Sequence, residues 1–483
     1  MRFDYAPAPQ PTDFVDLDAS YGLFVGGEFV DPVDGRRFKS VSPSSEQVLA
    51  EVAEAGAEDV DRAVATARQA YDAVWSKLPG LERGKYLFRI ARIIAERARE
   101  LAVLESLDNG KPIRESRDVD IPLVAAHFFY YAGWADKLPH AGLGTHPRSL
   151  GVAGQVIPWN FPLLMLAWKV APALACGNTV VLKPAETTSL TALRFAEICQ
   201  QAELPPGVVN IVTGAGETGR TLVTHPGVNK VAFTGSTEVG RSIAQSVAGT
   251  DKKVTLELGG KAANVIFDDA PIDQAVEGIV NGIFFNQGHV CCAGSRLLVQ
   301  ESVYEDVLAG LKRRMGTLRV GDPLDKNTDI GAINSPQQLE KIRLMSEVGE
   351  AEGARRWSPA CPLPERGYWF PPTVFTGVSQ AHRIAREEIF GPVLSVLTFR
   401  TPDEAIEKAN NTPYGLSAGV WTEKGSRIFW MAQRLRAGVV WANTFNRLDP
   451  ASPFGGYRES GYGREGGRHG LTAYLRTGQE AGQ

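Results

Sequence analysis

Along most of the chain, hydrophobic residues follow two alternating patterns, and this alternation predicts the fold class. Short apolar runs typical of buried strands are followed by stretches in which apolar residues recur every three or four positions, as in amphipathic helices. Such alternation is typical of a parallel, doubly wound sheet that binds its ligand beyond the carboxyl ends of the strands. In the first block we predict strands at 152–157, 179–182, 208–212 and 231–233, and helices at 161–174, 190–201 and 236–247.

The same alternation returns in the second half of the chain. There we predict strands at 264–267, 296–300, 393–399 and 417–422, and helices at 303–315, 402–410 and 426–435. The sequence between Met315 and Leu363 is polar, and no element is predicted in it. The chain is therefore predicted to be an α/β protein with two doubly wound domains.

The N-terminal part precedes the first block with shorter elements. Two strand-like pieces at 23–30 flank a Gly-Gly turn, and a third lies at 37–41. Apolar periodicity predicts helices at 57–69, 81–101 and 121–134, with a helix stop near Asn109-Gly110. The polar stretch 137–149 is either an extended arm or a linker, and 473–477 has the pattern of a strand.

Composition narrows the classes of function. A chain of 483 residues is too long for one hydrophobic core, so more than one domain is expected. With 51 Lys and Arg against 55 Asp and Glu, the net charge of -4 offers no basic surface for nucleic acid. Five cysteines without a Cys-x-x-Cys pair predict neither a disulfide framework nor a zinc site, and suit a reducing compartment.

One uncharged stretch, 150–168, is almost long enough to cross a membrane. It contains Gln155, Pro158, Asn160 and Pro162, so a strand, a break and a buried helix are the better prediction. The N-terminus lacks the apolar core of a signal peptide. We therefore expect a cytoplasmic protein that does not contact membranes.

The most distinctive stretch is a turn that carries two cysteines, Cys291 and Cys292. A helical pattern ends near Phe284, and Gly288 and Gly294 flank the pair. A cysteine attacks carbonyl groups as the thiolate, so it needs exposure and nearby donor groups, and a glycine-flanked turn provides both. The alternative is that both cysteines are small buried hydrophobic residues.

The sequence Phe-Asn-Gln-Gly-His-Val-Cys-Cys-Ala-Gly-Ser-Arg, which ends at Arg296, resembles the active-site signature of the NAD(P)-dependent aldehyde dehydrogenases. The resemblance makes Cys291 the nucleophile. The family usually has Gln or Glu two residues earlier, where this chain has His289. An imidazolium there would lower the pKa of the thiol, but we expect a solvated turn histidine.

Two further residues are predicted to be catalytic, Glu257 and Asn160. Because Glu257 lies between two leucines, its carboxylate is costly to ionise, and a raised pKa would suit a general base. The resemblance makes it the base that activates water to hydrolyse a thioester, a residue that CoA-acylating relatives generally lack. It also makes the Asn160 amide an oxyanion donor, with the backbone N–H of Cys291 as partner. An isolated Asn at this break is more often a turn residue.

Glycine-rich and charged motifs point to a dinucleotide. The G-x-G-x-x-G from Gly214 to Gly219 follows a predicted strand, but the acidic residue expected about twenty positions later is missing, so we assign it only a backbone approach near the adenine end. Ser236 begins a predicted helix, either as a phosphate contact or as a plain N-cap. The resemblance favours the phosphate contact.

The resemblance assigns the remaining cofactor contacts. Lys183 and Glu186 would bind the adenosine ribose, and the Glu186 carboxylate would repel a 2′-phosphate, which favours NAD over NADP. Glu388 would bind the nicotinamide ribose, and Phe390 would pack beside the ring. Without the resemblance, these charged residues would be solvated loop residues. The assigned set is Ile157, Pro158, Trp159, Lys183, Ala185, Glu186, Gly216, Gly219, Phe233, Gly235, Ser236, Leu258, Glu388 and Phe390.

By position, a further set of apolar residues would line the substrate tunnel, namely Phe161, Trp168, Phe285, Leu448 and Phe454. Such a lining implies an apolar or amphipathic aldehyde, although the same residues also fit a hydrophobic core. No metal site is predicted.

The resemblance extends from about residue 23 to 476. It implies an NAD-binding domain formed by 1–130 and 150–258, a catalytic domain at 259–459, and an oligomerisation arm formed by 131–149 and 470–483, in a homodimer or homotetramer. We predict that the protein oxidises a small-molecule aldehyde to a carboxylic acid with NAD. The alternatives are a thiol enzyme of the acyl-transfer or esterase type that forms no NADH, and a binding protein that kept the fold without catalysis.

Overall fold

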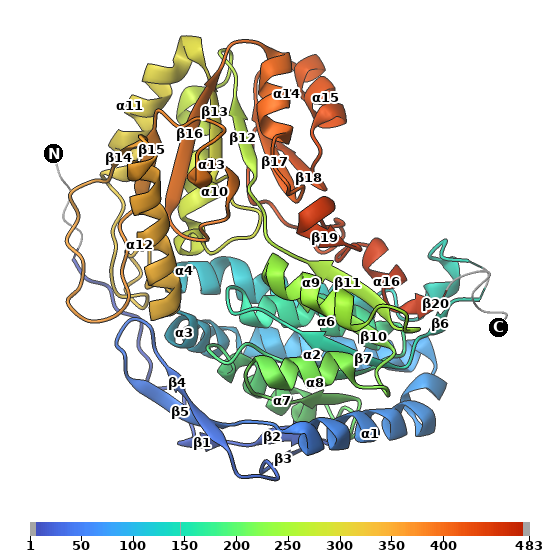
Figure 1. Cartoon of the computed structure of the whole chain (residues 1–483). Helices are drawn as coiled ribbons and strands as arrows, with labels where there is room; N and C mark the ends of the chain where they lie inside the picture. The colour runs from blue at the N-terminus through green and yellow to red at the C-terminus, as the bar shows by residue number, and fades with distance from the viewer. Residues whose placement is uncertain (1–5, 145, 477–483) are drawn as a thin grey trace.

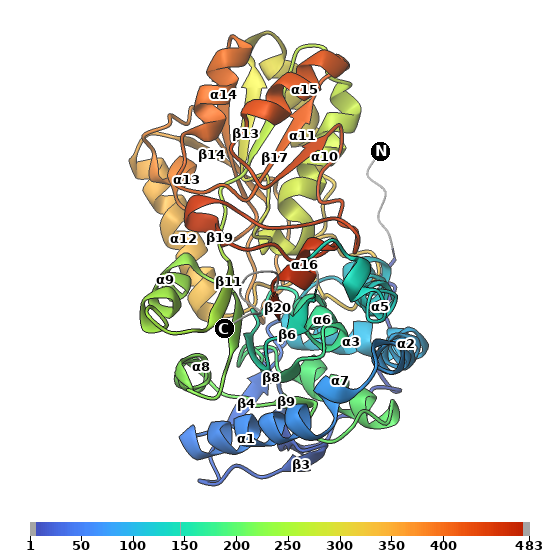
Figure 2. The same ribbon diagram turned by 90° about the vertical axis from the view of Figure 1, so that its right-hand side faces the viewer.

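The computed structural model describes residues 6–144 and 146–476. Its two large sheets lie one above the other in Figure 1, the lower built mainly from blue and green segments and the upper mainly from yellow and orange segments. Both sheets are mainly parallel, and helices cover both faces of each (Figure 2). The predicted fold class, α/β with two doubly wound sheets, is confirmed.

The first sheet has the strand order β19-β11-β10-β7-β8-β9-β2-β3. Its strands are β2 Leu23–Val25, β3 Glu28–Val30, β7 Val152–Val156, β8 Thr179–Lys183, β9 Val209–Ile211, β10 Lys230–Thr234, β11 Lys253–Glu257 and β19 Gly461–Tyr462. The strands β7 to β11 are parallel, and the antiparallel strands lie at the edges. Helices α1 Ala57–Ala73, α8 Gly216–Thr224 and α9 Thr237–Ser246 pack on one face, and α6 Pro162–Ala175 and α7 Leu190–Gln201 on the other.

Burial on both faces explains why this sheet could be predicted from hydrophobic runs alone. Every residue of β8 and β10 is buried, as is every residue of α6 except Met165. Strands covered by helices on both sides need nearly continuous apolar sequence rather than alternation.

The second sheet has the order β14-β15-β16-β13-β12-β17-β18 and is parallel except for β14. Its strands are β12 Ala263–Ile266, β13 Arg296–Gln300, β14 Arg355–Trp357, β15 Thr373–Thr376, β16 Val393–Phe399, β17 Ser417–Trp421 and β18 Val439–Ala442. Its helices are α10 Ile272–Phe284, α11 Tyr304–Met315, α12 Pro336–Ala351, α13 Arg383–Arg386, α14 Pro402–Asn410 and α15 Gly425–Arg434.

Smaller elements surround the two sheets. A three-stranded sheet consists of β1 Ser20–Tyr21, β5 Val48–Ala53 and β4 Arg37–Val41, and β6 Arg148–Ser149 pairs with β20 Leu475–Arg476. The remaining helices are α2 Gly80–Glu96, α3 Ala98–Asn109, α4 Ile113–Glu115, α5 Ile121–Ala132 and α16 His469–Thr472. Single turns are η1 Trp75–Lys77, η2 Ser116–Asp120, η3 Leu138–His140, η4 Phe285–Gly288, η5 Glu301–Val303 and η6 Arg458–Ser460.

Several predicted boundaries were wrong. The helix predicted at 81–101 is interrupted at Arg97, which ends α2 before α3 begins. The polar region before Leu363 contains α12 and β14, and β15, β18 and α8 were also missed. Among the described residues of the stretch 137–149, Arg148–Ser149 alone forms a strand. Of the predicted arms, residues 145 and 477–483 lie outside the described residues.

The uncharged stretch 150–168 is divided between β7, a turn and α6. Within the two described ranges, no helix is both long and apolar enough to cross a membrane.

Candidate active site

A cavity of about 950 Å³ opens between the two sheets. Its walls come from the loop between β7 and α6, the carboxyl ends of β10 and β11, helix α10, the turn after α10, and the loop after β18. This is the place where a doubly wound sheet binds its ligand. The three predicted catalytic residues, Cys291, Asn160 and Glu257, all line this cavity.

Cys291 follows a tight turn at the end of α10. Its side chain is partly exposed, whereas Cys292 is buried and lies 3.7 Å from the Asn446 side-chain oxygen, measured from its sulfur. The neighbouring Cys292 thiol and burial raise the pKa of Cys291 well above its usual value. The sulfur is therefore a thiol at neutral pH in the free protein, and it must lose its proton when it reacts.

Asn160 lies where the chain passes from β7 to α6. Its side chain is 5% exposed, and Nδ2 donates to the backbone oxygen of His289 at 2.8 Å. The Asn286 Nδ2 in turn donates to the backbone oxygen of Asn160 at 2.7 Å. Since an amide nitrogen carries two N–H groups, Asn160 keeps one donor in addition to the one that holds it in place.

Glu257 ends β11 and is almost fully buried, at 4% exposure. Burial, and then the nearby Glu465, raise the pKa of Glu257 well above its usual value, as predicted from its two leucine neighbours. Neither carboxylate oxygen has a hydrogen-bond partner among the described residues. The side chain is therefore available to a molecule in the cavity.

A buried ion pair lies behind Glu257, and the sequence analysis missed it. Lys169 Nζ donates to the Glu465 carboxylate, and to the Thr234 hydroxyl at 2.6 Å. Thr234, Glu257 and Glu465 line the cavity. The available signal was Lys169 itself, since a lone charge in an otherwise apolar helix must find a buried partner.

The prediction for His289 was wrong. Its side chain is fully buried, its ring meets Trp159 edge-on at 4.8 Å and stacks on Phe390 at 5.8 Å, both measured between ring centroids. Neither ring nitrogen has a hydrogen-bond partner in the described part of the chain. Burial, with the charge of Lys111, lowers the pKa of His289 to about 3. The ring is therefore neither solvated nor an imidazolium that would activate the thiol.

Predicted cofactor residues lie in two places. In the cavity wall, Glu388 Oε1 accepts the Gly260 backbone N–H at 2.9 Å, and Phe390 has a left-handed φ of 59°. At the end of β8, Lys183 Nζ lies 3.4 Å from the Glu186 carboxylate, and the Lys183 backbone oxygen accepts the Ile157 N–H at 3.1 Å. Ile157 continues into the cavity wall at Pro158.

Gly219 and Gly235 lie near these residues, and Gly235 is at a close approach. A Cβ on Gly219 would lie 3.6 Å from the Lys183 side chain, and a Cβ on Gly235 only 2.4 Å from the Phe233 ring, so Gly235 cannot carry a side chain without rearrangement. Ser236 caps α9, and its Oγ accepts the Val239 N–H at 3.3 Å. The N-cap alternative is thus present, and it leaves the first N–H groups of the helix free for a ligand.

The predicted residues divide by location. The cavity walls include Pro158, Trp159, Asn160, Phe161, Trp168, Gly235, Ser236, Glu257, Leu258, Phe285, Cys291, Glu388, Phe390, Leu448 and Phe454. Those outside the walls are Ile157, Lys183, Ala185, Glu186, Gly216, Gly219 and Phe233. Gln338 and Lys341 of α12 also line the cavity and were missed, because α12 was not predicted.

The two sheets, with Cys291 in the wall of the cleft between them, make this an α/β protein with a candidate active site. The aldehyde dehydrogenase family model matches residues 29–479. An aldehyde dehydrogenase of Alternaria alternata is 44% identical, over 97% of this chain and 96% of that protein. A mitochondrial benzaldehyde dehydrogenase of Antirrhinum majus is 46% identical, over 94% of this chain and 87% of that protein. The NAD+ complex of an aldehyde dehydrogenase from Bacillus cereus matches with a TM-score of 0.93 and 42% identity, covering 97% of this chain and 98% of its own. The chain belongs to the aldehyde dehydrogenase family, and it is an aldehyde oxidoreductase.

Proposed function

We propose that the protein oxidises an aldehyde to a carboxylic acid and that NAD accepts the hydride. The observation that carries this proposal is that Cys291, Asn160 and Glu257 line one cavity. A nucleophile, an oxyanion donor and a base in one cleft suffice for acyl chemistry at a carbonyl carbon.

The first step belongs to Cys291 and Asn160. The Cys291 thiol gives its proton to solvent water as the sulfur bonds to the aldehyde carbon, and the C=O π pair moves onto the oxygen, which becomes the negatively charged oxygen of the hemithioacetal. The free N–H of the Asn160 amide and the Cys291 backbone N–H stabilise this oxygen, and donors held in place before the reaction lose little in reorganisation. Loss of hydride from the carbon then leaves a thioester on Cys291.

The second step belongs to Glu257. Ionised, this carboxylate is a stronger base than a surface glutamate because its pKa is raised. It takes a proton from water as the water attacks the thioester, and the acid and the free thiol are released. This residue favours hydrolysis over transfer of the acyl group to another thiol.

The residues present fit a bound NAD, which would supply the hydride acceptor. Lys183 and the half-exposed Glu186 form a donor and an acceptor beside Gly219, the chemistry that the two hydroxyls of a ribose require. Glu186 would repel a 2′-phosphate, so NAD is favoured over NADP. The start of α9 at Ser236 offers N–H groups to a pyrophosphate, and Glu388 and Phe390 would hold the nicotinamide end.

The apolar lining supports an apolar or amphipathic aldehyde. Phe161 and Phe285 stack with centroids 6.2 Å apart, and Trp168 meets Phe454 edge-on at 5.3 Å. With Leu448 they give the cavity a wall suited to a ring or an alkyl chain. The benzaldehyde dehydrogenase among the relatives is in keeping with such a substrate.

We further assign 1–130 and 150–258 to the NAD-binding domain and 259–459 to the catalytic domain. The segments 131–149 and 470–483 would join copies of the chain as a homodimer or homotetramer. Pairing of β6 with β20 inside one chain brings the two segments together, which supports this assignment. Sedimentation of the purified protein tests it, and a monomer at working concentration would exclude it. The cytoplasmic location stays a prediction.

The decisive experiment measures NADH formation with aliphatic, aromatic and amino-aldehydes, each with NAD and with NADP. We expect activity with NAD and a preference for apolar aldehydes. Cys291→Ala should abolish NADH formation while NAD binding stays measurable, because the variant lacks only the nucleophile. Turnover retained by Cys291→Ala, or the absence of NADH formation by the unaltered protein with every aldehyde, would overturn the proposal.

A further inference from the structure

The turn before Cys291 adopts a costly backbone conformation. Asn286, Gln287 and Gly288 have positive φ values of 49°, 54° and 76°. Residues other than glycine rarely adopt this left-handed conformation, and three in succession persist only where surrounding groups hold them. Cys291 follows this turn by three residues, and the Asn160 side chain bonds to His289 between them.

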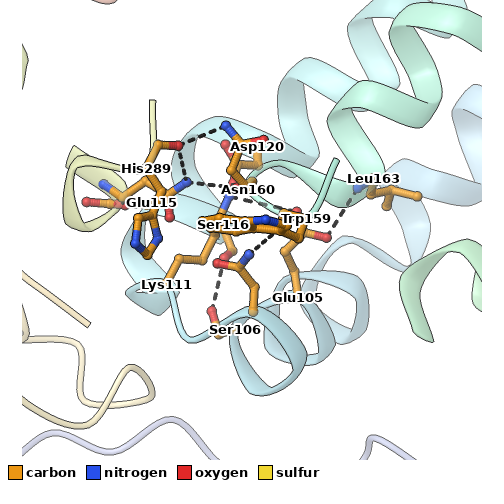
Figure 3. Close-up of polar contacts among 12 residues, drawn as sticks. Glu105, Ser106, Lys111, Glu115, Ser116, Asp120, Trp159, Asn160, Leu163 and His289 are labelled. Atoms are coloured by element: carbon orange, nitrogen blue, oxygen red, sulfur yellow. Dashed lines mark hydrogen bonds and ion pairs between the residues drawn. The ribbon is translucent and has the colours of Figure 1, made fainter. Parts of the chain in front are cut away.

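One buried carboxyl holds the start of this turn. Glu115, at the end of α4, accepts the Asn286 backbone N–H at 2.9 Å through Oε2. The Asn286 side chain donates to the Asn160 backbone oxygen at 2.7 Å, and the Asn160 side chain donates to the His289 backbone oxygen at 2.8 Å. Figure 3 shows Glu115, Asn160 and His289 gathered at this point. A continuous path of hydrogen bonds thus runs from Glu115 to the oxyanion donor and to the loop of the nucleophile.

Glu115 belongs to a buried group of charged residues, of which Asp120 lines the cavity and Glu115 does not. Lys111 Nζ donates to Asp120 at 2.6 Å and lies 3.9 Å from the Glu105 carboxylate (Figure 3). One ammonium faces several carboxyls, and burial raises the pKa of Glu115 to about 8 and that of Glu105 to about 7. At neutral pH Glu115 is therefore largely protonated, and its carbonyl oxygen is still able to accept the Asn286 N–H.

The same group also reaches the other side of Asn160. Glu105 Oε2 accepts the backbone N–H of Leu163, in the first turn of α6, at 3.4 Å. Buried carboxyls cost free energy to keep, and hydrophobic residues of similar size would fill the same space. Unlike hydrophobic residues, these carboxyls accept backbone hydrogen bonds, Glu115 from Asn286 and Glu105 from Leu163. Both bonds hold segments that meet at Asn160.

We infer that Glu115 is a positioning residue for the oxyanion donor, because it fixes the left-handed turn at Asn286 and through that turn the Asn160 amide. This inference rests on the proposed function, which gives Asn160 an oxyanion to stabilise. What matters in Glu115 is an acceptor oxygen at the distance that the length of its side chain sets, and not a negative charge.

Two substitutions separate reach from charge. Glu115→Gln keeps the length and an acceptor oxygen but has no charge, and we expect kcat within about threefold of the unaltered protein. Glu115→Asp keeps the carboxyl but is one methylene shorter, so the Asn286 N–H loses its acceptor. We expect kcat to fall about 10- to 100-fold in Glu115→Asp, in line with the cost of misplacing a catalytic group by about 1 Å, while the KM for NAD changes less than about threefold. The reverse order, with Asp active and Gln impaired, would overturn the inference.

A double-mutant cycle tests the route through Asn160. In an Asn160→Ala background the oxyanion donor is already gone, so Glu115→Asp should lower kcat by less than about threefold more. The same 10- to 100-fold loss in both backgrounds would mean that Glu115 acts elsewhere or only stabilises the fold. If Glu115→Asp does not fold, loss of activity in Glu115→Gln would overturn the inference and retained activity would support it. If the unaltered protein forms NADH but the losses from Glu115→Asp and Asn160→Ala are additive, this inference alone is overturned. If the unaltered protein forms no NADH, the proposed function is overturned.

Discussion

Two parts of the cavity are built differently. The polar corner consists of Cys291, Asn160 and Glu257, and the apolar wall consists of Phe161, Trp168, Phe285, Leu448 and Phe454. In the polar corner, directed hydrogen bonds such as that from Asn160 to His289 fix the geometry. In the apolar wall, rings pack at centroid distances of 5.3 to 6.2 Å without such bonds. Under the proposed function, chemistry in the corner depends on residue identity, whereas selection of the aldehyde by the wall depends on shape.

The first prediction breaks the polar corner and has the largest effect. In Glu257→Gln, the thioester should form but not hydrolyse, because only the base for water is lost. We expect one burst of NADH per active site, followed by steady-state turnover about 10²- to 10⁴-fold slower. Rapid-mixing absorbance of NADH separates the two phases.

The control for this variant is Glu82→Gln, which removes a half-exposed carboxylate of α2 that pairs with Lys85 at 2.7 Å. It should leave both phases unchanged. If Glu257→Gln lost the burst as well, Glu257 would be needed before the thioester forms.

The second prediction alters the apolar wall and should leave the polar corner intact. Leu448→Phe replaces a leucine of the wall by a larger phenyl ring and so narrows the cavity. We expect the ratio of kcat/KM between an aromatic and a short aliphatic aldehyde to change about tenfold, the usual effect of small changes in an apolar pocket. The kcat for the short aldehyde should change less than about threefold.

Leu344→Phe, at an exposed position of α12, is the matched control and should alter neither aldehyde. An equal loss with both aldehydes in Leu448→Phe would mean that the wall and the corner are not independent.

The difference between corner and wall also explains what the sequence could predict. Glu257 was assigned a raised pKa from its two leucine neighbours, and burial in the fold gives that result. Strands such as β8 and β10 were found because burial on both faces leaves nearly continuous apolar runs. These features are local, so neighbouring residues carry the information.

Features that depend on distant contacts were missed. Helix α12 is largely polar, and its local signals are the Ser335 cap, Pro336 in the first turn and the buried spacing of Leu339, Ile342 and Met345. His289 was expected in solvent because a histidine in a turn ordinarily lies at the surface. Its burial comes from Trp159 and Phe390, which lie far away in the sequence, and no local pattern indicates that they meet.

The last and smallest prediction concerns how the stability of the fold depends on pH through His289, whose backbone oxygen holds the Asn160 amide of the polar corner. The folded pKa of this ring is about 3, below the value of about 6.5 expected for an unfolded chain. Below pH 6.5 the unfolded chain therefore binds a proton that the folded protein does not. The stability due to the neutral ring is present above pH 6.5 and is lost as the pH falls toward 3, by at most about 1.4 kcal/mol per pH unit.

His289→Gln should remove this part of the acid sensitivity. Thermal unfolding between pH 7 and pH 4.5 measures it, and the unfolding midpoint of the variant should fall less steeply than that of the unaltered protein. His127 is also fully buried, and burial lowers its pKa to about 3. The unfolding midpoint of His127→Gln should therefore also fall less steeply with pH. His140→Gln, at an exposed position, is the control and should leave the slope unchanged. Equal slopes in all four proteins would mean that the His289 ring gains its proton in the folded state, and the polar corner would then carry a charge next to Cys291.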